Sequence, residues 1–283
     1  MSSTLVIRPM ETADMERALD WAAEEGWNPG LEDAAAFRDS DPGGFFVGEC
    51  DGTPVSCISA VRYGEDFGFI GFYICHPDWR GQGLARPLWD RALEHLKGRT
   101  IGLDAVLAQE ETYRLTGFES DYHTLRHGGL SVATPPMDPR VAVLGQGVMP
   151  SVLAYDRPFF ATTRDRFLTT WCAPMIAGRR GYVFVEEGNL RGYGVIRRCR
   201  EGFKIGPLLA DTPEIADTLF QALAGEVRGQ MVFLDVPAAN EAGLDLAEKY
   251  ELSPEFETVR MYRGPSPELD LARTYGITTL ELG

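Results

Sequence analysis

Cysteine and histidine are scarce in this chain, and each shortage excludes a class of protein. The 283 residues contain five cysteines, an odd number without a Cys-x-x-Cys pair, and four histidines that show no metal-ligand spacing. A disulfide-stapled secreted domain and a zinc site are therefore both disfavoured. We expect free thiols that are buried as small hydrophobic side chains, a reducing compartment, and no metal.

Positive charge and long apolar runs are also lacking. The chain has 27 Lys and Arg against 42 Asp and Glu, a formal net charge of −15. A general nucleic-acid binder needs a basic surface, so we expect no nucleic-acid partner. The acidity either favours a cationic substrate such as a protonated amine or simply keeps the protein soluble. No apolar run approaches the roughly 20 residues that span a bilayer, and no secretory signal is visible. We therefore expect a cytoplasmic protein without a membrane partner.

One glycine-rich stretch carries the strongest signal that is present. Arg80-Gly81-Gln82-Gly83-Leu84-Ala85 follows the apolar segment 67–75 and precedes an amphipathic pattern that predicts a helix from about Gly83. Pro87 then lies in the first helical turn, where a missing N–H matters little. Glycines let the backbone approach a ligand closely. The unpaired N–H groups and partial positive charge of a helix start attract anions. The stretch therefore predicts a seat for a phosphate or pyrophosphate.

Several other interpretations of this stretch are possible. A nucleotide-binding P-loop needs a terminal Gly-Lys-Ser/Thr, and the stretch has no lysine. A dinucleotide fingerprint needs a third small residue where Arg86 stands, although Asp104 lies about the right distance downstream for a ribose contact. An ordinary strand-to-helix turn is the simplest alternative, but such turns seldom carry two glycines next to an arginine.

Two motifs together resemble those of a known family. The pattern Arg80-x-x-Gly83-x-Ala85 follows a strand that ends at Pro77, and Tyr113-x-x-x-Gly117-Phe118 comes after it at a suitable distance. In this order they resemble the acyl-CoA loop and the closing motif of the GNAT acetyltransferase superfamily, and the resemblance covers about residues 4–127. It implies an N-acetyltransferase that moves acetyl from acetyl-CoA to an amine by direct attack, without an acyl-enzyme. The acceptor, a small-molecule amine or a peptide, is not specified.

The order of predicted elements divides the chain into two similar halves. Residues 1–127 read β-α-α-β-β-β-α-β-α-β, and residues 141–283 repeat much of this order. Glycines and prolines make 128–140 the predicted linker. The fold class is therefore α/β with a mixed α+β sheet, as two GNAT-like domains in tandem. We expect the first half to bind acetyl-CoA by itself.

The second half lacks the phosphate-loop motif. Gly206-Pro207-Leu208-Leu209-Ala210-Asp211 stands where that loop should be, and it places a carboxylate near a helix start. A carboxylate there repels a pyrophosphate. We therefore expect one acetyl-CoA per chain, and a degenerate second domain that covers or shapes the acceptor pocket.

The resemblance also implies roles for residues around the loop. Residues 80–85 would hold the pyrophosphate, namely Arg80, Gly81, Gln82, Gly83, Leu84 and Ala85. The strand before the loop would splay from the next strand, so that Ile74 and Cys75 pair with the pantetheine arm. Trp27 and Asn28 would border the acceptor, although a packed tryptophan and a turn asparagine would look the same.

The resemblance implies an acid and leaves the base open. Tyr113 occupies the usual acid position, and a phenol with an ordinary pKa near 10 can protonate a leaving thiolate; otherwise it is a core aromatic residue. Many family members carry a glutamate in the strand before the loop, but residues 67–75 contain no carboxylate. Asp104, in the next strand, is the first candidate for the base, or else a structural carboxylate. The missing glutamate also allows a rival hypothesis, a non-catalytic acyl-CoA-binding sensor or scaffold.

Overall fold

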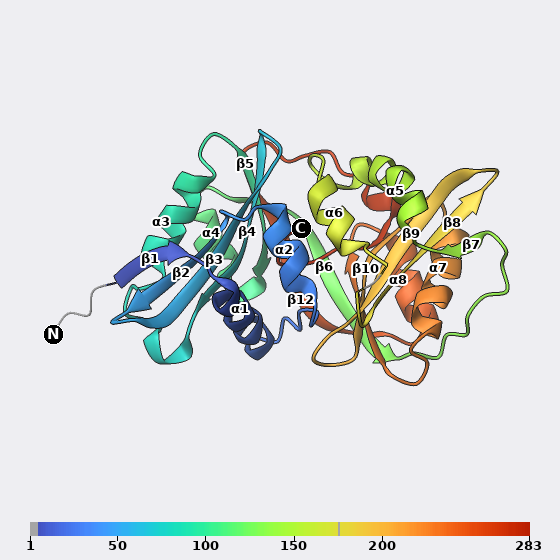
Figure 1. Cartoon of the computed structure of the whole chain (residues 1–283), viewed down its shortest axis with the longest axis horizontal. Coiled ribbons are helices and arrows are strands. Elements are labelled where there is room, and N and C mark those ends of the chain that lie inside the picture. The colour runs from blue at the N-terminus through green and yellow to red at the C-terminus, as the bar shows by residue number, and fades with distance from the viewer. Residues whose placement is uncertain (1–4, 175) are drawn as a thin grey trace.

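The computed structural model describes residues 5–174 and 176–283, which form two similar halves side by side (Figure 1). The first half has the predicted order of strands and helices. Its elements are β1 (Leu5–Pro9), α1 (Thr12–Glu24), α2 (Asp33–Ser40), β2 (Phe45–Cys50), β3 (Thr53–Tyr63), β4 (Phe67–Cys75), α3 (Arg86–His95), β5 (Thr100–Val106), α4 (Glu110–Arg114) and β6 (Glu119–Leu130). The expected linker overlaps this last strand, because residues 128–130 belong to β6, whereas 131–140 contain no helix or strand.

The second half also contains every predicted helix and strand, and two short strands that the sequence did not suggest, β7 and β13. Its elements are β7 (Val141–Val143), α5 (Met149–Asp156), α6 (Asp165–Trp171), β8 (Arg179–Glu186), β9 (Asn189–Arg198), β10 (Phe203–Ala210), α7 (Pro213–Gly225), β11 (Met231–Pro237), α8 (Glu241–Lys249), β12 (Ser253–Arg263) and β13 (Thr274–Gly276). The fold class is thus the predicted mixed α/β class.

The two halves share one continuous sheet because they exchange strands. The strand order is β1-β2-β3-β4-β5-β12-β6-β11-β10-β9-β8-β7, with β13 paired to β10. Strand β12, late in the chain, lies next to β5 of the first half. Strand β6, from the first half, lies next to β11 of the second. Residues 1–127 therefore lack β12, the strand that pairs with β5 on the side away from β4.

Each exchanged strand carries a buried arginine that pairs with an aspartate directly across the ladder. Arg260 of β12 lies opposite Asp104 of β5 and donates to both carboxylate oxygens, at 2.7 and 2.9 Å. Arg126 of β6 lies opposite Asp235 of β11 with the same two distances. Since an unpaired charge in the interior is costly, these bidentate pairs penalise any other register.

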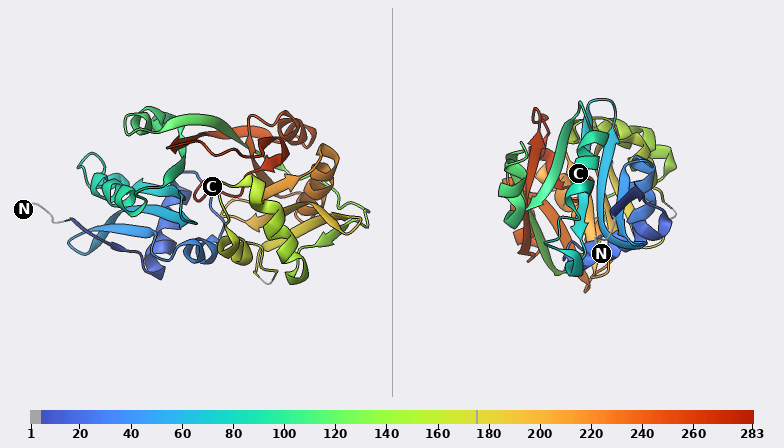
Figure 2. Two further views of the ribbon diagram at one scale, coloured as in Figure 1. Left: turned by 90° about the horizontal axis from the view of Figure 1, so that it is seen from above. Right: turned by 90° about the vertical axis from the view of Figure 1, so that its left-hand side faces the viewer.

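The hydrophobic core runs through the contact between the halves. Helices α1 and α2 pack on one face of β3 and β4, and α6 of the second half packs against α2. There the rings of Phe37 and Trp171 stack with centroids 6.2 Å apart. Helix α3 covers the other face of β3–β5 through Leu88 and Trp89. The C-terminal end of the chain, marked C, lies between the halves in Figure 1 and in the left view of Figure 2. All five cysteines are free.

Candidate active site

Strands β4 and β5 run parallel and then separate, as the resemblance implied. Their pairing ends at Ile70 and Leu103. Beyond that point the register between β3 and β4 shifts, and Phe72 has a φ of 48°. A non-glycine residue in this left-handed region marks a bulge that turns the strand. The bulge bends the end of β4 away from β5 and opens the sheet on one side.

A cavity of about 340 Å³ lies at this opening. Its lining comes from β4 and β5, from the loop after β4, from α4, and from β12 and the chain end. The lining residues used below are Glu25, Trp27, Gly71, Tyr73, Ile74, Cys75, Arg80, Ala85, Asp104, Tyr113, Phe256, Thr258, Leu280 and Glu281. The cavity therefore joins the predicted loop to residues that only the second half supplies.

The glycine-rich loop forms an exposed turn ahead of α3. Gly81 and Gly83 have φ of 76° and 75°, and no heavy atom lies within 4 Å of where a Cβ would stand on either. The backbone N–H groups of residues 81–86 donate to no acceptor in the described part of the chain. Helix α3 begins at Arg86, later than the predicted Gly83, and Pro87 lies in its first turn as expected. Unpaired donors at a helix start suit an anion.

Arg80 connects this loop to the cavity. Its Nε donates to the Cys75 carbonyl at 2.9 Å, and its guanidinium pairs with Glu25 of the α1–α2 connection. Arg80 and Ala85 line the cavity, whereas residues 81–84 lie outside it. The two residues predicted to pair with a pantetheine arm both line the cavity, namely Ile74 and Cys75. The Cys75 carbonyl, however, already accepts from Arg80.

Tyr113 lies in the cavity wall beside α3. The residue is half-buried, and its ring packs against Trp89 and Phe118 with centroids 5.3 and 6.2 Å away. Burial, with a smaller contribution from Tyr73, raises the pKa of the Tyr113 phenol above its usual range. The phenol therefore keeps its proton at neutral pH. Tyr73, which sequence reasoning did not single out, also lines the cavity, and burial raises its pKa to about 12.

Asp104, the first candidate for the base, is bound by an arginine. The side chain is fully buried, and both of its oxygens accept from Arg260. Burial raises the pKa of Asp104, while the charge of Arg260 opposes that rise. These contacts favour the structural alternative named above, in which the carboxylate holds β12 in register with β5. Sequence reasoning could not find its partner, which lies 156 positions away.

The structure separates the two residues expected to border an acceptor. Trp27 lines the cavity, and its carbonyl accepts from Lys204 Nζ at 3.0 Å and from Arg126 Nη1 at 2.8 Å. Asn28 does not line the cavity. It has a φ of 50°, and its side chain exchanges two hydrogen bonds with the backbone of Glu201. Asn28 thus fixes the α1–α2 connection to the second half.

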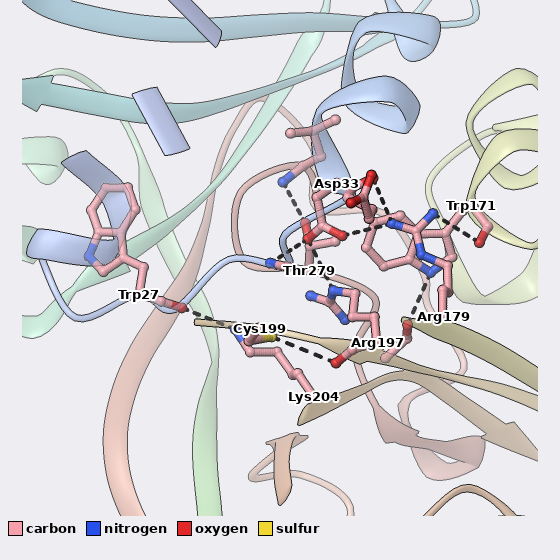
Figure 3. A network of polar contacts seen from close by, with 12 residues as sticks. Trp27, Asp33, Trp171, Arg179, Arg197, Cys199, Lys204 and Thr279 are labelled. Atoms are coloured by element: carbon pink, nitrogen blue, oxygen red, sulfur yellow. Dashed lines mark hydrogen bonds and ion pairs between the residues drawn. The ribbon is translucent and has the colours of Figure 1, made fainter. Parts of the chain in front are cut away.

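A buried network of charged side chains also holds the α1–α2 connection in place (Figure 3). Asp33, at the start of α2, accepts from Arg179 at 2.8 Å and from Arg197 at 3.0 Å, and from the Gly30 N–H at 2.9 Å. Lys204 is fully buried next to this network, and burial lowers its pKa to about 8. Strands β8–β10 of the second half therefore position the loop that carries Trp27.

Glu281 is the residue of the cavity wall that sequence reasoning missed. It belongs to the segment after β13, which the sequence marked only as apolar enough to pack on the body. The side chain is 2% exposed, and neither carboxylate oxygen has a hydrogen-bond partner in the described part of the chain. No local pattern around Glu281 distinguishes it from a surface glutamate.

The equivalent opening in the second half is filled by the chain itself. Strands β10 and β11 are parallel and pair only over 203–205 and 232–234. Beyond that point β13 pairs with β10 at Leu208 and Leu209, and the Ile277 N–H donates to the Asp235 carbonyl at 2.9 Å. At the start of α7 the Asp211 carboxylate accepts from Tyr155 and pairs with Arg191 and Arg273. Both the cleft and the helix start are thus occupied.

Within residues 5–174 and 176–283, no group of three or more His, Cys, Asp or Glu side chains is placed to hold a metal ion. In the same residues, no helix has the length and apolar character needed to cross a bilayer.

Comparisons with known proteins assign both halves to one family. The model of the acetyltransferase (GNAT) family matches residues 12–118, and that of an acetyltransferase (GNAT) domain matches residues 152–276. The holothin acyltransferase of Pseudoalteromonas sp. (strain SANK 73390) is 30% identical over 281 residues, which cover 99% of this chain and 95% of the relative.

Solved structures show the same fold over the whole chain. A putative acetyltransferase from Pyrococcus horikoshii has a TM-score of 0.81 at 22% identity, with 99% of this chain and 96% of that one covered. A tandem GNAT protein from the clavulanic acid biosynthesis pathway has a TM-score of 0.64 at 16% identity, with 93% and 100% covered.

The chain therefore belongs to the GNAT acetyltransferase superfamily, in its tandem form. It is an acyltransferase. The family typically uses an acyl-CoA, which is consistent with the unpaired N–H groups at the start of α3.

Proposed function

We propose that the protein transfers an acetyl group from acetyl-CoA to the amine of a small molecule, by direct attack and without an acyl-enzyme. The cavity at the separation of β4 and β5 carries this proposal. It connects the loop residue Arg80 to Tyr113, and both to Trp27 on the side of the second half. One continuous space thus adjoins an anion seat, a protonated phenol and an aromatic wall.

The residues present fit acetyl-CoA, which would supply an activated acetyl thioester. The exposed N–H groups of residues 81–86 are suited to its pyrophosphate, because two glycines there leave the backbone uncovered. Ile74 and Cys75 lie on the stretch of β4 that has no partner on the β5 side. Tyr113 would donate its phenol proton to the leaving thiolate, and its raised pKa keeps that proton available at neutral pH.

We expect one acetyl-CoA per chain, because β13 fills the second cleft and Asp211 occupies the second helix start. Calorimetric titration of the full chain with acetyl-CoA should give one equivalent. Two equivalents, or a site that survives in a variant with a disabled first loop, would contradict this division between the halves.

The acceptor side favours a small molecule with an aromatic or apolar body. Trp27, Phe256 and Leu280 form an apolar wall there, and the Thr258 hydroxyl has no partner in the described part of the chain. The relative named for holothin, which aligns over nearly the whole chain, supports a small-molecule acceptor over a peptide. Holothin therefore belongs in the first acceptor panel.

A thiol-release screen tests the proposed function. The full chain is incubated with acetyl-CoA and a panel of small amines, holothin among them, and free CoA is measured with a thiol reagent. Calorimetry of acetyl-CoA binding runs in parallel. Amine-dependent release is the expected result. Saturable acetyl-CoA binding with no release by any amine would favour the sensor hypothesis instead.

A further inference from the structure

Glu281 is a buried carboxylate without a partner on the wall of a substrate cavity. Three carboxylates line that cavity. Glu25 pairs with Arg80, and Asp104 is held at both oxygens by Arg260. Of these three carboxylates, only Glu281 has no hydrogen-bond partner for either oxygen in the described part of the chain. Because buried charges are normally paired, an unpaired one on a residue that lines a cavity indicates a role toward a ligand.

The backbone of Glu281 is fixed on β4 next to the bulge. A Cβ on Gly71 would lie 2.0 Å from the Glu281 carbonyl oxygen, so only glycine allows this close approach. Ile277, before Glu281, is bonded to the Asp235 carbonyl, and the Leu282 carbonyl accepts from the Tyr63 hydroxyl at 3.1 Å. The segment is thus anchored on both sides of Glu281.

We propose that Glu281 is the general base that takes a proton from the acceptor's ammonium group. The inference rests on the proposed function. Strand β4 has no carboxylate of its own, and the segment after β13 brings the backbone of Glu281 to Gly71, at the opening between β4 and β5. A segment from the far end of the chain therefore completes the first half's site.

The surroundings of Glu281 suit a base. Burial raises the pKa of Glu281. Lys204 of β10, Arg197 of β9 and Arg126 of β6 act against this rise, and Asp33 of α2 adds to it. A carboxylate with a raised pKa is a stronger base than an ordinary one and accepts a proton more readily.

Glu281 and Tyr113 together account for every proton transfer in the reaction. The ammonium gives one proton to Glu281, and the freed electron pair of the nitrogen forms the C–N bond as the C–S bond breaks. Tyr113 gives its proton to the sulfur. The second nitrogen proton returns through solvent to the Tyr113 phenolate, and Glu281 releases its proton to solvent. The net reaction yields an amide, free CoA thiol and one proton.

The test compares two acceptors that differ in their need for a base. At neutral pH 2-phenylethylamine is protonated, whereas hydroxylamine is largely neutral and can attack directly. Glu281→Gln should lower kcat/KM for 2-phenylethylamine by roughly 10²- to 10⁴-fold and change that for hydroxylamine little. Acetyl-CoA affinity by calorimetry should be unchanged. Glu268→Gln, which removes an exposed carboxylate from the same chain end, is the matched control.

Each other outcome overturns a defined part of the argument. Equal losses with both acceptors would make Glu281 a structural partner of Lys204 and Arg197, and unchanged rates would remove it from the reaction. A wild-type protein that binds acetyl-CoA but acetylates no amine of the screening panel would refute the proposed function, and the base with it. Gly71→Ala offers an independent variant, because its methyl group displaces the Glu281 backbone. It should show the same selective loss, and full 2-phenylethylamine turnover in it would contradict the assignment.

Discussion

A single charge placed in the loop ahead of α3 should distinguish an anion seat from an ordinary turn. Gly83→Asp introduces a carboxylate at a position with a φ of 75° and open space around it. Gly98, in the turn after α3, has a φ of 83° and is equally open. Gly98→Asp is therefore a matched control, with the same strain and the same charge at the other end of the helix.

The size of the effect follows from electrostatics. Both variants carry a similar cost of roughly 1–2 kcal/mol for a side chain in the left-handed region, and this cost cancels in the comparison. Two unit charges about 4 Å apart interact by about 1 kcal/mol in water and about 4 kcal/mol near a protein surface. Since a pyrophosphate carries two charges, Gly83→Asp should weaken acetyl-CoA binding by roughly 30-fold or more.

Calorimetry with acetyl-CoA measures this difference directly. Gly98→Asp should bind acetyl-CoA as the wild type does. Both variants should fold, with a similar small decrease in melting temperature caused by the strained residue. At about 1 M salt, where the screening length falls to about 3 Å, the gap between the two variants should narrow. Equal affinity in the two folded variants at low salt would refute the assignment of this loop to the pyrophosphate.

Three further predictions concern the cavity and the ion pairs. Tyr113→Phe should lower kcat by roughly 10²-fold without changing acetyl-CoA affinity, whereas Tyr250→Phe in the second half should not; equal turnover at every pH would leave Tyr113 a packing residue. Asp104→Asn should destabilise the protein by roughly 3–5 kcal/mol in urea titrations, because it leaves the buried charge of Arg260 unpaired. Replacing both Asp104 and Arg260 by leucine should recover most of this lost stability. A stable but inactive Asp104→Asn would restore Asp104 as the base. Because burial raises the pKa of Glu281 above its ordinary 4.5, the folded chain holds this proton more tightly than the unfolded chain and loses the associated stability as pH rises through the folded pKa. The melting temperature of Glu281→Gln relative to wild type should therefore increase as pH rises from about 4.5 to the folded pKa and stay level above it. A difference that does not change with pH would contradict the raised pKa.

The sequence predicted the order of elements well because each one has its own local pattern. The period of the apolar residues is a short-range feature, and the structure has the helices and strands that it predicts. The loop at 80–85 could be singled out for the same reason. The start of α3 was placed too early because glycines in a turn and in a first helical turn look alike in sequence.

What the sequence could not show depends on contacts between distant positions. The alternation in β12 predicts a strand but not its neighbours, so the exchange with β6, which argues against an independent first half, was not foreseen. Asp104 was interpreted as a base because Arg260 is far away in the chain. Glu281 gained its place only through Gly71, whose missing side chain has no meaning until the two segments meet.

The exchange of strands also sets the order in which the protein can be completed during synthesis. Strand β5 leaves the ribosome long before β12, since 156 positions separate Asp104 from Arg260. In the interval β5 presents an open edge, and such edges pair readily with other chains. Long-range pairing is also slow to form. A message that ends before β12 should therefore yield a chain prone to aggregation rather than a fragment with half the activity.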